Sequence, residues 1–254
     1  EVADGDWSSD VCSSDLVAVG VGGNGGTGGD GDEVTVNLNG VINTYGDLSH
    51  GVFAQSTGGG GGDGAWVVDA SATAGNKALD INTGVGGSGG TGGHGADVTV
   101  NLPAASHLST YGHAASGVLA QSIGGGGGSG GGVMTYGASL SGGRNAKSGS
   151  IDVAVGGKGA DGGKGGAVNI TADTKLFTTG DLAPGIFAQS VGGGGGFGGN
   201  VSALSVAASL DPEINSSSGE GGQNISASVA VGGWGGDGQI GGTVTVSTGY
   251  SEIG

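Results

Sequence analysis

The chain has 254 residues, of which 69 are Gly, while aromatic residues make up 4% and charged residues 11%. Gly is roughly fourfold above its average usage of about 7%. Residues without a side chain cannot fill the interior of an ordinary compact enzyme domain. Collagen is excluded because Gly is not strictly at every third residue and Pro occurs only three times. The formal charge of −16 repels phosphate backbones, so nucleic acid is not expected as a partner.

The first sixteen residues share no pattern with the rest of the chain. Residues 6–16 read DWSSDVCSSDL, and their back-translation spells a widely used short-read sequencing adapter. We interpret residues 1–16 as an artefact of sequence assembly and exclude them from the fold prediction. Cys12, the only cysteine, then leaves the argument. Both ends of the remaining sequence are expected to be cut.

Three sequence blocks recur in the same order along the chain. An alternation such as VTV follows a Gly-rich stretch, and a T-x-G triplet comes next. The third block reads G-[VI]-[FL]-A-Q-S-x and is followed by five Gly. The first block occupies 34–36, 98–100, 168–170 and 244–246, the second 44–46, 110–112 and 178–180, and the third 51–62, 117–128 and 185–196. Such self-similarity is the mark of a repeat architecture.

Within the first module, period-two alternation of Val, Ile, Thr and Ala predicts strands at 33–38, 51–57, 65–72 and 78–83. No apolar pattern of period 3.6 runs longer than about two turns, so helices should be rare. Short strands at regular spacing predict an all-β solenoid, in which each module buries its apolar face by stacking on its neighbours. The predicted modules span 17–83, 84–152, 153–226 and, in truncated form, 227–254.

The Gly tracts allow several interpretations. Five consecutive Gly residues suit sharp bends, places of close backbone approach, or disordered connectors. Runs with a GGx pattern occupy 25–31, 86–95, 156–166 and 232–238. We expect irregular loops there, although threefold spacing also suits an extended polyproline-II-like helix with Gly on the packed edge.

The AQS block with its five Gly, together with the upstream VTV and T-x-G-D elements, resembles the Gly-rich passenger repeats of bacterial autotransporters. The resemblance covers residues 17–254. It implies a passenger carried across the outer membrane of a Gram-negative bacterium by a C-terminal β-barrel that lies outside this sequence. It also implies a parallel β-solenoid or β-helix-like array with Gly-rich loops, placed at the cell surface or outside the cell.

Catalytic and metal-binding motifs carry little weight in this composition. Residues 86–90 and 127–131 fit G-x-S-x-G, but a nucleophile elbow needs a strand before it and a helix after it. Residues 92–97, GGHGAD, match six positions of a calcium-binding nonapeptide, and Thr99 then stands where a large apolar residue is required. Asp97 is therefore interpreted as an isolated surface carboxylate. The four His residues, His50, His94, His107 and His113, lack metal-ligand spacing.

We expect no catalytic residue, no metal site and no cofactor. The repeated polar positions are Gln55, Gln121 and Gln189, each followed by a serine, Ser56, Ser122 and Ser190. The glutamines either recognise a ligand or, as we prefer, form stacked amide hydrogen bonds or cap the bend before the five Gly.

The sequence therefore predicts a non-enzymatic surface stalk or adhesin-like module, with a host or neighbouring-cell ligand as the partner of an adhesin. Two alternatives stay open. One is a spacer for an enzymatic module elsewhere in the full protein, and the other is a Gly-rich ice-binding or matrix protein.

Overall fold

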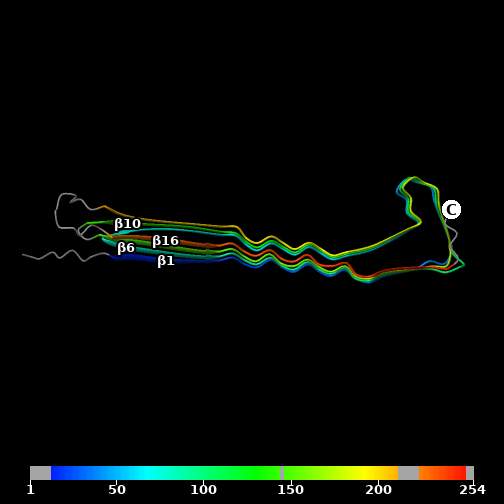
Figure 1. The fold of residues 1–254 in the computed structure, drawn as a ribbon, viewed down its shortest axis with the longest axis horizontal. Coiled ribbons are helices and arrows are strands. Elements are labelled where there is room, and N and C mark those ends of the chain that lie inside the picture. The colour runs from blue at the N-terminus through cyan, green and yellow to red at the C-terminus, as the bar shows by residue number, and fades with distance from the viewer. Residues whose placement is uncertain (1–12, 144–145, 211–222, 250–254) are drawn as a thin grey trace, which may run out of the picture.

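The computed structural model describes residues 13–143, 146–210 and 223–249 (Figure 1). These residues form strands and no helix, as the sequence predicts, and the strands make five sheets. Sheet A contains β1 (Ser13–Val21), β6 (Lys77–Val85), β11 (Lys147–Val155) and β16 (Gln223–Val231), and sheet B contains β2 (Val34–Asn37), β7 (Val98–Leu102), β12 (Val168–Ala172) and β17 (Val244–Thr248). Sheet C contains β3 (Val41–Thr44), β8 (His107–Thr110) and β13 (Lys175–Thr178). Sheet D contains β4 (Val52–Thr57), β9 (Val118–Ile123) and β14 (Ile186–Val191), and sheet E contains β5 (Val67–Gly75), β10 (Val133–Gly142) and β15 (Val201–Leu210).

The chain returns to the same sheet after every five strands, and we call each such passage a circuit. All paired strands are parallel, so that Val21 lies beside Val85 and Gln55 beside Gln121. Residues 1–12 lie outside the described part of the chain, whereas Ser13 to Leu16 pair with β6. That pairing does not test the adapter interpretation, which stays a prediction.

The predicted strands of the first module coincide with β2, β4, β5 and β6, but the sequence prediction missed β3. β3 has only four residues, and a Gly at position 40 and a turn after Thr44 bound it closely. β2 is equally short but alternates as VTVN, whereas β3 reads VINT with two adjacent apolar residues and so lacks the period-two pattern of a strand.

The molecule is elongated, with different sheets at its two ends (Figure 1). Sheets A and E pack on each other at one end, and sheets B, C and D surround the main apolar core at the other. The largest buried side chains of that core are Leu102, Leu108, Ile170 and Leu176. Apolar burial at this end follows the inward-facing positions of the VTV and AQS blocks, as stacking of modules requires.

Two kinds of Gly-rich segment connect the ends. The GGx segments (residues 22–33, 86–97, 156–167 and 232–243) join sheet A to sheet B, and the pentaglycine segments (58–66, 124–132 and 192–200) join sheet D to sheet E. Gly25 and Gly28 each donate a backbone hydrogen bond of 2.8 Å to the next GGx segment, and Gly22 donates one of the same length to Val85 at the end of β6.

These hydrogen bonds recur at every third residue. The hydrogen bonds between a pentaglycine segment and its GGx segment recur with the same spacing. Gly59 and Gly62 donate to the carbonyls of Gly29 and Gly26, so that a pentaglycine segment runs antiparallel to its GGx segment. A three-residue period with every hydrogen bond made to a neighbouring segment is typical of polyproline-II-like packing. The prediction of irregular loops was therefore wrong.

Glycine is required in these segments because there is no room for a side chain. A Cβ atom added to Gly128 would lie 1.9 Å from the carbonyl oxygen of Gly62, and one added to Gly93 would lie 1.9 Å from that of Gly29. Among the described glycines, only Gly40 and Gly143 have positive φ. The tracts are thus places of close backbone approach rather than sharp bends.

A single methyl group inside this packing should destabilise the protein. Gly128→Ala is expected to lower the free energy of unfolding by about 1–3 kcal/mol, because the new Cβ overlaps the Gly62 carbonyl. Gly126→Ala is the matched control in the same tract, since the nearest atom to its added Cβ is 3.8 Å away. Urea unfolding followed by circular dichroism measures both, and equal stabilities of the two variants would contradict the packing described.

Candidate functional site at the AQS block

The AQS blocks lie in sheet D, with alternate side chains facing the core and the solvent. In β4 the buried side chains are Val52, Ala54 and Ser56, whereas Phe53 and Gln55 are exposed. The same residues of β9 and β14 lie beside them in register. The sheet therefore places the repeated serines in one inward-facing column, in which Ser56 and Ser122 are buried and Ser190 is half-buried, and the repeated glutamines in one surface column.

The buried serines connect sheet D to the GGx segments of two successive circuits. Ser122 Oγ donates to the carbonyl of Ala96 at 2.8 Å and accepts from the backbone N–H of Gly166 at 2.8 Å. Ser190 makes the equivalent pair with Gly166 and Gly242, both at 2.7 Å. Because a buried hydroxyl needs partners for both its donor and its acceptor, these contacts assign the serines a structural role.

The glutamines form a ladder of side-chain amides on the surface. Gln55 Nε2 donates to Gln121 Oε1, and Gln121 Nε2 donates to Gln189 Oε1, each at 3.2 Å. Each amide thus supports the one in the next circuit, which is the arrangement that we preferred from the sequence. The structure brings all six repeated positions together as two columns within one sheet.

A further set of side chains, missed by the sequence prediction, bonds successive circuits together. The third residue of a GGx triplet faces outward, and in several triplets its side chain accepts a hydrogen bond from the backbone N–H of its neighbour in the next circuit. Asn24 accepts from Ser88 at 2.9 Å, and Asp30 accepts from His94 at 2.7 Å. His94 Nδ1 accepts in turn from Lys164 N at 2.8 Å. Alignment of the x positions of the GGx runs would have revealed these short polar acceptors.

The residues of the weak catalytic and metal motifs take part in the same backbone contacts. Ser88 and Ser129 of the G-x-S-x-G matches donate their backbone N–H to Asn24 and Asp63. Asp97 of the calcium-like motif accepts from the backbone N–H of Ala167 at 2.7 Å, so it is bonded rather than isolated. The described residues contain no group of three side chains suited to hold a metal ion.

The remaining histidines are also spread over local contacts. His50 Nδ1 accepts from the backbone N–H of Ser116 at 3.1 Å. His107 Nε2 lies 3.3 Å from Ser109 Oγ, and the backbone N–H of His113 donates to Asp47. None of these contacts brings two histidines together.

Next to this region, the rings of Tyr45 and Tyr111 stack 5.0 Å apart on the surface.

Sheets A and E enclose a polar interior that the sequence did not predict. Asp80, Asn82 and Asp152 are fully buried between them. Asn82 Nδ2 donates to Asp152 Oδ1 at 2.8 Å, and Ala138 N donates to Asp80 Oδ2 at 3.0 Å. Burial raises the pKa of the Asp152 carboxyl above its usual value of 3.8, and Asp80 and Asp69 add to the rise. The hydrogen bonds from Asn82 and from Gly137 N act in the opposite direction.

The narrow gap between the two sheets explains this interior. A Cβ atom added to Gly84 would lie 2.4 Å from Val133 Cγ1, and one added to Gly137 would lie 2.5 Å from Ser150 Oγ. Most of the side chains in this gap are small, and several of them are hydroxyls without a hydrogen-bond partner. These are Thr73, Thr135, Ser139, Ser141 and Ser150. Burial of unpaired hydroxyls costs stability.

No protein-family model, curated protein or solved structure matches the chain. Within the described residues, no helix has the length and apolar character needed to cross a membrane. The repeated side chains of the AQS blocks lie in columns that run parallel to the direction in which the circuits stack.

Removal of one buried serine hydroxyl should destabilise the protein. Ser122→Ala is expected to lower the free energy of unfolding by about 1–3 kcal/mol, since it leaves the N–H of Gly166 and the carbonyl of Ala96 unpaired. Ser129→Ala is the control, because only its backbone N–H takes part in the contact with Asp63. Thermal unfolding of both variants tests this, and an unchanged melting temperature for Ser122→Ala would refute the role.

The buried carboxyl of Asp152 should make stability depend on pH. Because its pKa is raised in the folded state, folding favours the protonated form, and stability present below pH 3.8 is lost as the pH rises through the folded value. Asp152→Ser should reduce this loss. Its hydroxyl can accept from Gly137 N, as Ser228 Oγ accepts from Ser205 N at 3.0 Å in the next circuit.

The control for this experiment is Asp32→Ser, which removes an exposed carboxylate. Urea unfolding from pH 4 to pH 8 should show a flatter profile for Asp152→Ser than for the wild type and for Asp32→Ser. Identical profiles for the three proteins would contradict the proposed effect of burial.

Proposed function

We propose that this chain is a parallel β-solenoid segment that serves as a non-enzymatic structural module, a stalk or adhesin-like rod, in the passenger of an autotransporter. The observation that carries the proposal is the recurrence of the same contacts from one circuit to the next. The Gln55–Gln121–Gln189 amide ladder and the serine contacts of Ser122 and Ser190 follow one axis. Contacts of this kind extend a rod circuit by circuit.

Secretion through a narrow pore is compatible with the composition. Beyond Cys12 the chain has no cysteine, so no disulfide can cross-link it before transport. The stacking of each new circuit on the previous one would hold the emerging part outside the cell. In this proposal, an outer-membrane β-barrel elsewhere in the full protein is the partner that transports the module.

Among the alternatives, an ice-binding surface is less well supported than a stalk. Such a surface requires a regular array of threonines. The best candidate column contains Thr35, Thr99 and Thr245, but Asn169 interrupts it. A spacer for an enzymatic module has the same rod geometry as a stalk, and it differs only in what the rest of the protein carries.

Antibodies raised against the 254-residue chain test the proposed location. They should label intact source cells, and brief treatment of intact cells with an external protease should remove the label. The control is an antibody against a cytoplasmic enzyme, which should label only lysed cells. Labelling of our protein in lysed cells alone would contradict the proposal.

A further inference from the structure

The outer face of sheet A is a broad apolar surface. We define this face by the outward side chains of β1, β6, β11 and β16. They lie in four rows across the sheet. The first row is Asp15, Leu79, Gly149 and Ile225, and the last is Val21, Val85, Val155 and Val231. All of its side chains are Val, Ile, Leu or Ala, except for Asp15, Thr83 and Gly149.

The apolar side chains of the edge strands β1 and β16 are the most exposed, whereas on the central strands Leu79 and Val85 are each 37% exposed and the others are half-buried. The relative exposure is 67% for Val19, 73% for Val21, 65% for Ile225 and 50% for Val229. Monomeric soluble proteins rarely expose contiguous apolar patches of more than a few hundred Å². The charged side chains of Lys77 and Lys147 lie at the rim of the face, one register beyond Leu79. An apolar centre with a polar rim is the usual anatomy of an interface.

No segment among the described residues covers this face. Sheet E occupies the opposite side of sheet A, which there carries mostly small or polar side chains such as Gly84, Asp80 and Asn82. A shift of one residue that turned the valines inward would force them into a gap where a single Cβ already overlaps Val133. The described residues therefore leave this apolar face open to a partner.

The area of the face matches what a second copy requires. Together with its rim at Lys77 and Lys147, the outer side of sheet A has four strands about 4.8 Å apart with nine residues at roughly 3.3 Å each, and it covers on the order of 600 Å². Two such faces in contact bury about 1,200 Å², which is the lower end of the range for specific protein interfaces. The face has no charge at its centre, so it is complementary to itself, and two copies can use the same patch.

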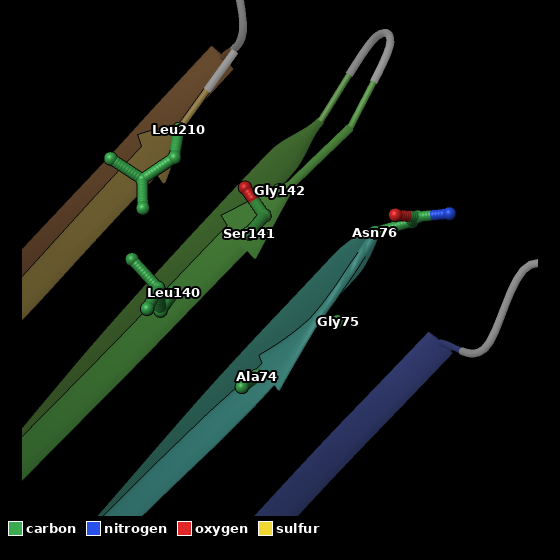
Figure 2. Close-up of a pocket in the computed structure, with 7 residues that line it drawn as sticks. All are labelled: Ala74, Gly75, Asn76, Leu140, Ser141, Gly142 and Leu210. Carbon is green, nitrogen blue, oxygen red and sulfur yellow. The ribbon is translucent and has the colours of Figure 1, made fainter. Parts of the chain in front are cut away.

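The outer face of sheet E is a weaker candidate. Its outward positions alternate between large apolar side chains such as Leu204 and Val206 and small ones such as Ala70, Ala72 and Ala138, and an open hollow interrupts it near the tip. Figure 2 shows this hollow, with Leu140 and Leu210 projecting from neighbouring strands and the short side chain of Ala74 on the third. A hollow face buries less area against a flat partner than sheet A does.

We propose that two copies of this chain associate face to face through the outer face of sheet A, about a two-fold axis. The contact joins flat rows of Val and Ile and excludes water from them. Because each copy carries a formal charge of −16, mutual repulsion opposes the contact at low ionic strength. Association should therefore become tighter as salt is added.

Sedimentation velocity of the full chain over a hundredfold range of concentration tests this proposal. The wild type should show a concentration-dependent dimer that is favoured at about 1 M over about 0.15 M NaCl. The Val19→Lys/Val229→Lys variant introduces charges at two positions of one register across the face, and its dimer dissociation constant should rise at least tenfold. Val19→Thr/Val229→Thr keeps the β-branched shape and should weaken the dimer less.

Two matched variants identify the face. Val41→Lys changes a valine of equal exposure, 65%, on β3, and Leu204→Lys changes the outer face of sheet E. Both should dimerise like the wild type. A wild type that stays monomeric, or a dimer that Leu204→Lys disrupts while the Val19/Val229 variants preserve it, overturns the proposal. So does binding of a monomeric wild type to phosphatidylcholine vesicles, which would make lipid the occupant of the face.

Discussion

Backbone packing without side chains is the constraint on which the rest of the structure depends. A line of hydrogen bonds crosses the whole stack through the Gly-rich segments. It runs from Gly62 to Gly26, from Gly90 to Gly62, and from Gly128 to Gly90. The carbonyls lie where a Cβ atom would otherwise be. These hydrogen bonds therefore hold successive circuits in register, and the strands of the sheets at both ends pair in the same register.

The two ends use this register in different ways. Around sheets B, C and D, large side chains such as Leu108 and Ile170 fill the space between the sheets and form the core. Sheets A and E adjoin the closely packed Gly-rich segments and stay close together, so most side chains between them are small or polar, beside a small apolar cluster of Val67, Val133 and Ala154. Their larger apolar side chains consequently face outward, which provides the surface that we propose for self-association.

The sequence predicts the features that depend on local alternation. The VTV and AQS segments are strands, and the repeated serines and glutamines lie in columns. It does not predict which side of 78–83 faces inward, because Leu79 and Ile81 alternate with Asp80 and Asn82 and favour apolar burial. The ordering of the Gly tracts was missed for a similar reason. Their stability comes from hydrogen bonds between residues more than 20 positions apart, which leave only a threefold spacing as a local signal.

Hydrogen exchange of the Gly-rich segments tests the account most directly. Mass spectrometry of peptides covering residues 86–95 and 124–131 measures the amides of Gly90 and Gly128, which bond to the carbonyls of Gly62 and Gly90. We predict that these amides exchange as slowly as those of β7 in the adjacent core. Exchange at the rate of an unstructured chain in both peptides, with β7 protected, would contradict the account.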